Sequence, residues 1–289
     1  MLAAPTSAIA LTREKLLAIA ATLPADLRVL SKLAEILKDP NSELDDIAAL
    51  LRRDVALATQ IVRISNSAAY GGGRSVSSIE DAVNRVGFGE VLRLVGTASA
   101  GRLSESALVC YDLGAKLLRD NMLYAAFAAE ALARPAGIDP RVAYNAGLVR
   151  AVGMMILDRA GRKDAATTPL YSPARWPDFE VWEANVFGVT NTEVTALVLE
   201  EWGFPGEVTA SVRAHHLTQP ADLEQPLAAL LNVANGLAQH VCRTFRGEES
   251  WWEINADKLR AARLTEDDFG PAVVAAEEAF DAANAALGG

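Results

Sequence analysis

The feature that most constrains this chain is one positive charge inside an otherwise apolar helical segment. Over residues 146–157 every residue except Arg150 is apolar or small, which is typical of a helix buried in a protein core. The helix is expected to begin at Asp139 and Pro140, a capping residue followed by proline in the first turn, and to run to about Asp158. Because an unpaired buried guanidinium is costly, Arg150 needs a partner inside the fold.

Helical periodicity continues along nearly the whole chain and predicts an all-α fold. No alternating strand pattern, internal repeat or low-complexity linker is found. A chain of 289 residues that is 51% hydrophobic and 22% charged can bury a substantial core. The second half is expected to open with one long helix over about 107–133, and residues 244–264 are its least regular part. Further helices are expected at about 178–187, 191–202, 206–216, 223–243 and 265–286.

The acidic balance and the low cysteine content exclude several classes of protein. The net charge is −10 and no basic stripe occurs, so nucleic acid is not an expected partner. No uncharged apolar run is long enough to span a membrane, and the first residues lack the basic region of a signal peptide. Cys110 and Cys242 are too few for a disulfide framework and are expected to be free core thiols of a cytoplasmic protein.

Several motifs, taken together, resemble those of the HDOD domain family. The amino-terminal motifs are Leu23-Pro24, Leu27, Asp54-Val55-Ala56-Leu57, Asn66-Ser67-Ala68-Ala69-Tyr70-Gly71, Ser77-Ser78-Ile79-Glu80-Asp81-Ala82 and Val86-Gly87. The later motifs are Gly147-Leu148-Val149, Phe187-Gly188-Val189, Glu200-Glu201-Trp202-Gly203-Phe204-Pro205 and His215-His216. The resemblance implies a multi-helix fold related to the HD-type metal-dependent phosphohydrolases and, usually, a role in bacterial signal transduction.

The resemblance also suggests how the chain is divided. Residues 1–21 form an N-terminal segment, and residues 22–240 form the HDOD domain. That domain consists of an N-terminal helical half, 22–104, and an HD-like half, 105–240. Residues 241–289 form a C-terminal helical extension.

In the related hydrolases, His and Asp side chains from several helices hold one or two metal ions. The resemblance places the corresponding positions, from the first histidine to the last aspartate, at Asp120, Arg150, Ala151, Asn191, His215, His216 and Asn235. The His-Asp pair of the superfamily thus falls on Arg150 and Ala151. Only the pair His215 and His216 keeps the metal-binding residue type.

These replacements predict a degenerate metal site. Arginine stays protonated and offers no lone pair, so Arg150 repels a divalent cation, and Ala151 contributes no ligand. A catalytic metal needs several good ligands and an open position for water. We therefore expect no bound metal, no cofactor, no catalytic residue and no metal-assisted hydrolysis.

Two arrangements of Arg150 are compatible with the sequence. Asp120 lies on an apolar stripe, so a direct buried ion pair between Asp120 and Arg150 is favoured, with Glu183 or Asn191 as further partners. Alternatively, Arg150 extends along a half-exposed helix and reaches solvent with its charged end.

The histidine and tryptophan pairs each allow two interpretations as well. His215 and His216 either retain weak metal or anion binding or form a helix-end pair with one imidazole hydrogen-bonded in the core. Trp251 and Trp252 either form a patch that binds a partner or pin the C-terminal extension onto the main body.

The leading functional hypothesis is a non-catalytic signal-transduction module that acts through contacts with signalling proteins of unknown identity. A homo-oligomer is compatible with it. One alternative is a sensor in which Arg150, His215 and His216 hold the phosphate of a nucleotide. Another is a residual metal-dependent phosphodiesterase that uses Asp120, His215 and His216.

Overall fold

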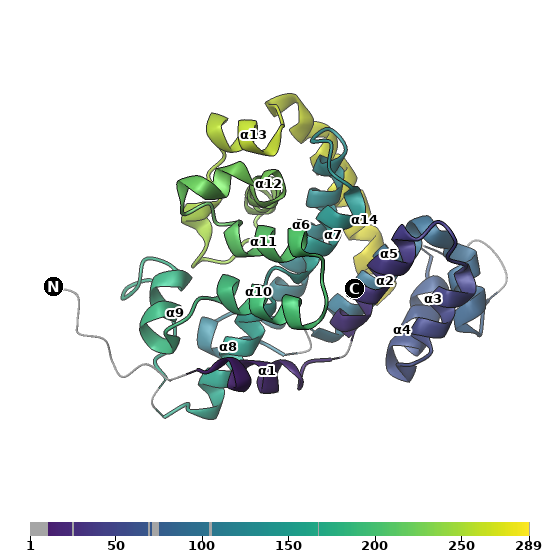
Figure 1. Ribbon diagram of the computed structural model, residues 1–289, viewed down its shortest axis with the longest axis horizontal. Helices are drawn as coiled ribbons and strands as arrows, with labels where there is room; N and C mark the ends of the chain where they lie inside the picture. The colour runs from purple at the N-terminus through teal and green to yellow at the C-terminus, as the bar shows by residue number, and fades with distance from the viewer. Residues whose placement is uncertain are drawn as a thin grey trace.

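A computed structural model describes residues 11–24, 26–68, 70, 75–103, 106–166 and 168–288 (Figure 1). Within these ranges the chain forms fourteen α-helices, four short 3-10 turns and no strand. The all-α prediction is therefore confirmed. The first ten residues of the predicted N-terminal segment lie outside the described ranges.

Three helices of the N-terminal half pack around a long, bent helix, whereas the first helix of the chain contacts the second half instead. The bounds are α1 Arg13–Ala20, α2 Asp26–Lys38, α3 Leu44–Leu51, α4 Val55–Ser65 and α5 Ile79–Leu103. The bend in α5 lies at Gly87, whose φ of 72° is in the left-handed region that favours glycine. Asp54 caps α4 by accepting a hydrogen bond from the amide of Leu57 (2.9 Å). Beyond the bend, α5 packs against the second half of the molecule.

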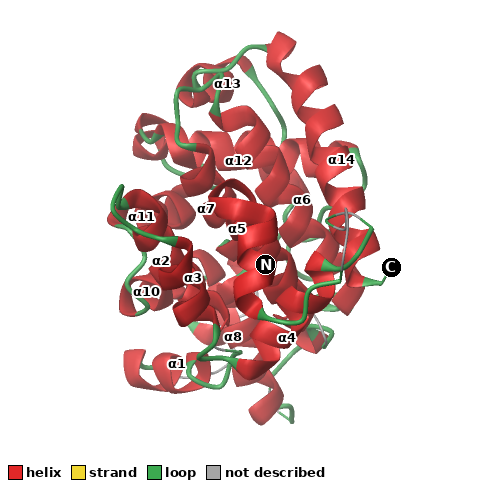
Figure 2. Ribbon diagram, turned by 90° about the vertical axis from the view of Figure 1, so that its right-hand side faces the viewer, coloured by secondary structure: helices red, strands yellow, loops and turns green. Residues whose placement is uncertain are grey.

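The second half is built around α6. Its helices are α6 Ala115–Ala133, α7 Pro140–Val149, α8 Val152–Lys163, α9 Phe179–Phe187, α10 Asn191–Glu201, α11 Gly206–Ala214, α12 Pro226–His240, α13 Ala256–Ala262 and α14 Phe269–Leu287. Helix α6 packs against α7, α12 and α14. Figure 2 shows α6 between α12 and α14.

Two of the predicted helices differ most from the structure. The helix expected from 107 begins only at Ala115, because a 3-10 turn over Val109–Tyr111 precedes it. Asp112, with a φ of 54°, ends that turn in the left-handed conformation. The helix expected over 139–158 is interrupted between α7 and α8 at Arg150 and Ala151.

The C-terminal extension is an integral part of the packing. Helix α14 contacts α6 in the HD-like half and also α4 and α5 in the N-terminal half. Cys242, predicted as a core thiol, is exposed at the end of α12, whereas Cys110 is buried as expected; both are free thiols. Among the helices of the described ranges, none combines the length and apolarity needed to cross a lipid bilayer.

Candidate functional site

The glycines on either side of the junction between α7 and α8 pack against two other helices and leave no room there for a side chain. A Cβ on Gly147 would lie 2.8 Å from the carbonyl oxygen of Ala125 in α6. A Cβ on Gly153 would collide with the carbonyl oxygen of Asn191 in α10. The hydroxyl of Thr195 accepts a hydrogen bond from the Gly153 amide (2.8 Å) and donates one to the Asn191 carbonyl (2.7 Å). These contacts fix the backbone from which the next side chain enters the core.

The side chain placed there is Arg150, which is 0% exposed. Its Nη1 lies 3.2 and 3.0 Å from the two carboxylate oxygens of Glu248, and its Nη2 donates to the amide oxygen of Asn121 (2.5 Å). The rings of Phe245 and Trp252 lie 5.3 and 5.4 Å from the guanidinium carbon, within cation–π range. Arg150 is thus enclosed by an anion, an amide and two aromatic rings.

Arg150 does form a buried ion pair, but the prediction that Asp120 is its partner is wrong. Asp120 pairs with Lys116 one turn earlier in α6 and with Arg119 (3.2 Å). Arg150 pairs instead with Glu248. Complete burial also contradicts the alternative in which Arg150 reaches solvent.

The other two predicted partners of Arg150 bond to each other. Glu183 in α9 accepts hydrogen bonds from the Asn191 backbone amide (2.6 Å) and from the Asn191 side-chain amide (3.0 Å). The Tyr111 hydroxyl donates a third (2.6 Å). Burial raises the pKa of Glu183 to about 8, and these donors oppose the shift only in part. The site therefore holds a second buried carboxyl group whose bonded neighbours are all neutral.

His215 and His216 lie side by side at the end of α11, with ring centroids 4.3 Å apart. Nδ1 of His215 is 2.6 Å from the Val212 carbonyl oxygen, and Nδ1 of His216 is 2.7 Å from a carboxylate oxygen of Glu180. Because both partners are acceptors, we assign the ring proton to Nδ1 in each histidine. Burial lowers the pKa of both imidazoles well below its ordinary value, and the nearby positive charge of Arg150 adds to this. Both rings are therefore neutral.

The tryptophan pair covers these two rings. Trp251 stacks on His216 at 3.8 Å between ring centroids, and Trp252 stacks on His215 at 5.7 Å. Trp252 is 1% exposed. This arrangement is the one in which the pair pins the extension onto the main body, and it brings residues 245–252, here called the sealing segment, over Arg150, His215 and His216.

These positions do not fit a divalent metal ion. Arg150 brings a positive charge, and Ala151 is buried with only a methyl group to offer. The amide of Asn235 donates to the Leu231 carbonyl within its own helix (2.8 Å). In the described part of the chain, no group of three or more His, Cys, Asp or Glu side chains is placed to hold a metal. We therefore derive no chemistry through a metal.

Sequence reasoning missed three residues of this cluster, Glu248, Phe245 and Asn121. Glu248 lies 98 positions after Arg150, in a stretch without helical periodicity, so nothing local marks it as a core residue. Asn121 adjoins Asp120 in a helix whose following residues are mostly buried, and that placement could have identified it. The predicted members that do lie together are Arg150, His215 and His216.

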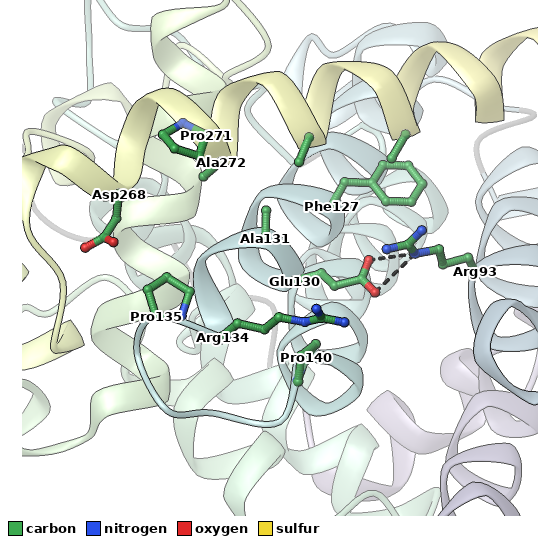
Figure 3. Close-up of a pocket in the computed structure, with 12 residues that line it drawn as sticks. Arg93, Phe127, Glu130, Ala131, Arg134, Pro135, Pro140, Asp268, Pro271 and Ala272 are labelled. Atoms are coloured by element: carbon green, nitrogen blue, oxygen red, sulfur yellow. Dashed lines mark hydrogen bonds and ion pairs between the residues drawn. The ribbon is translucent and has the colours of Figure 1, made fainter.

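An open concave feature lies elsewhere, between α6 and α14 (Figure 3). It is a groove of about 490 Å³ with a floor of small and apolar side chains, including Phe127, Ala131 and Ala272. An ion pair between Arg93 and Glu130 (2.9 Å) closes one side. This groove is at the C-terminal end of α6, whereas the Arg150 cluster contacts the N-terminal half of that helix.

Comparison with known proteins adds the following. The sequence pattern of the HDOD domain family matches residues 23–218 of this chain. A protein of Treponema pallidum (strain Nichols), itself uncharacterized, is 28% identical over 240 residues, which cover 81% of this chain and 45% of that protein. The chain thus spans less than half of the length of this relative.

Two solved structures share the fold. A proposed phosphohydrolase from Shewanella amazonensis SB2B is 21% identical, with a TM-score of 0.64 over 94% of this chain and 97% of that one. A proposed signal transduction protein from Marinobacter aquaeolei VT8 is 21% identical, with a TM-score of 0.65 over 92% of this chain and 58% of that one. At such identities the likeness concerns the fold alone.

Proposed function

This chain belongs to the HDOD domain family, and from that premise we propose that it is a non-catalytic regulatory module that acts by binding other signalling proteins. The observation that carries the proposal is the buried guanidinium of Arg150 at a position where the related hydrolases place a metal-binding histidine. A metal-dependent phosphohydrolase needs its metal ion and an opening through which the substrate reaches it. Here the guanidinium of Arg150 occupies the place of the metal, and the sealing segment closes the opening.

The phosphodiesterase alternative has less support. Of the three residues it requires, Asp120 is engaged by Lys116 and Arg119, while the Nδ1 hydrogen bonds of His215 and His216 leave only Nε2 of each ring as a possible ligand atom. The Nε2 atoms of both histidines are buried and have no hydrogen-bond partner in the structure. A metal held by these two imidazoles would lie beside the guanidinium, which repels it.

The sensor alternative also has less support. A phosphate bound by Arg150 would have to replace Glu248, because both carboxylate oxygens of Glu248 already contact the guanidinium. Arg150 and Glu248 are each 0% exposed, so a nucleotide would first have to displace the sealing segment.

The regulatory hypothesis draws support from the wider likeness. One structural neighbour is described as a proposed signal transduction protein, which fits a regulatory role for this fold. Interaction with partners through the outer surface requires no opening of the Arg150 cluster. A cytoplasmic location and signalling partners complete the proposal.

Metal analysis and an activity assay test this proposal on the full chain. Purified protein, expressed with added iron, manganese and zinc, is analysed by mass spectrometry and assayed against bis(p-nitrophenyl) phosphate and a cyclic dinucleotide. We expect substoichiometric metal and no turnover above a heat-denatured control. Stoichiometric metal together with turnover would contradict the proposal. A thermal shift with a cyclic nucleotide would support the sensor instead.

A further inference from the structure

The chemistry around Arg150 has the character of a binding site for a planar cation. Three of the four side chains that contact its guanidinium, Phe245, Glu248 and Trp252, come from the sealing segment, and Asn121 comes from α6. A carboxylate, an amide oxygen and two aromatic faces all stabilise a positive charge. The sealing segment therefore supplies most of what the cation needs, although it lies outside the residues that match the family.

Asn121 provides a second connection between Arg150 and the C-terminal extension, in addition to the contacts of the sealing segment. Its amide oxygen accepts from Arg150, and its amide nitrogen donates to the carbonyl oxygen of Arg243 (2.5 Å). Arg243 in turn pairs with Glu277 of α14 (2.6 Å) and lies 4.2 Å from the ring centroid of Phe280. One amide thus bridges the guanidinium and the backbone just before the sealing segment.

The charges of this cluster balance only when the guanidinium is present. Among the described residues, Arg150 is the sole ion-pair partner of Glu248. Burial raises the pKa of Glu248, and the charge of Arg150 opposes that shift. Without the guanidinium, the sealing segment would carry a buried carboxylate with no counter-charge.

We propose that α6 and the sealing segment form a guanidinium-binding site, filled by Arg150, that holds the C-terminal extension on the HD-like half. An organic cation of the chain thereby occupies positions that the resemblance assigns to a metal. One part of the chain thus binds another, and this contact does not depend on the regulatory function proposed above.

Chemical rescue with methylguanidinium tests the site. Arg150→Ala in the full chain should lower Tm by about 8 °C or more, because it leaves Glu248 unpaired. At roughly 10 mM, methylguanidinium should raise the Tm of this variant by about 3 °C if it binds with a millimolar dissociation constant. The wild type, whose site is filled, and the double variant Arg150→Ala/Glu248→Ala should change by less than about 1 °C relative to the same concentration of sodium chloride.

The outcomes separate clearly. Rescue confined to Arg150→Ala supports the site, whereas no rescue, or equal rescue of the double variant, overturns it. If Arg150→Ala does not fold, Arg150→Lys keeps the charge and loses the planar fork. Trypsin should then cut at the exposed Arg246 at least about tenfold faster than in the wild type, since the sealing segment opens more often.

A matched control is Arg260→Ala, which removes an exposed ion pair with Asp257 in the same extension. This change should leave cleavage at Arg246 unaltered. Unchanged cleavage in Arg150→Lys would also overturn the proposal.

Discussion

Glu248 and Glu183 are both fully buried carboxyl groups, yet their surroundings differ in charge. Glu248 faces the guanidinium of Arg150, whereas the hydrogen-bond donors to Glu183 are the neutral groups of Tyr111 and Asn191. For Glu183, burial outweighs these donors and raises the pKa to about 8. At neutral pH this group therefore holds a proton for most of the time, while Glu248 balances a permanent cation.

The comparison shows two ways of accommodating a buried acid. One uses a fixed counter-charge, which opposes the upward shift that burial gives to the pKa of the carboxyl group. The other uses a proton from solvent, and its energy depends on pH. Removing a charge should therefore be costly in the first cluster, and changing the pH should matter more in the second.

The largest effect is expected for Glu248→Leu. The substitution leaves Arg150 buried without an anion and should reduce the free energy of unfolding by about 3–5 kcal/mol. Urea denaturation followed by far-UV circular dichroism measures it. The control is Glu249→Ala, which changes the exposed residue next to Glu248 and should alter the free energy of unfolding by less than about 0.5 kcal/mol. A loss below about 1 kcal/mol in Glu248→Leu would show that the ion pair matters little.

The next effect is a pH dependence that belongs to Glu183. Its folded pKa of about 8 lies above the ordinary 4.5, so the protonated group contributes stability that is lost as the pH rises through 8. Between pH 6.5 and 8 the wild type should lose about 1.5 kcal/mol relative to Glu183→Gln, which does not titrate. Urea midpoints across this range test it, and parallel curves for the two proteins would contradict the raised pKa.

The histidine pair should act in the opposite direction at lower pH. Because the folded pKa of His216 is depressed, the unfolded chain takes up protons below pH 6.5 while the folded chain does not. Stability is therefore complete above 6.5 and declines toward acid by up to about 1.4 kcal/mol per pH unit for each histidine. His216→Gln, which keeps a donor for Glu180, should lose less between pH 6.5 and 5. An equal acid loss in both proteins would exclude His216 as its source.

The smallest effect is expected for Tyr111→Phe. It removes one hydrogen bond to Glu183 and no charge, and should cost about 1 kcal/mol at pH 6. Because that bond stabilises the ionised carboxylate, the cost should grow as the pH rises above 8. A cost that is the same at pH 6 and pH 9 would mean that Glu183 does not change its ionisation over this range.

Most of the helical architecture could be predicted because helical periodicity is a local property of the sequence. The helices at Phe179–Phe187 and Asn191–Glu201 lie within one residue of their predicted bounds. The apolar residues on every side of Arg150 favoured its burial, although the sequence also allowed an arrangement in which its charged end reaches solvent. The break between α7 and α8 could not be predicted, because it depends on how closely α10 approaches Gly153.

The partner of Arg150 could not be predicted for a related reason. Asp120 shows the helical pattern of a buried residue, yet basic neighbours within one turn of its own helix satisfy its charge. Glu248 lies in a polar stretch and is buried only because two neighbouring aromatic residues, Phe245 and Trp252, dock against the core. Such a contact between distant segments leaves no periodic signal.

The position of the sealing segment also bears on where the molecule can be divided. The family match ends at residue 218, but the carboxylate that pairs with the buried Arg150 belongs to Glu248. A recombinant fragment that ends at residue 218 would lack the sealing segment and leave the guanidinium of Arg150 without its carboxylate partner. We therefore expect that such a fragment does not fold by itself. The smallest portion able to fold by itself must reach past Trp252, and fusion points are best chosen beyond it.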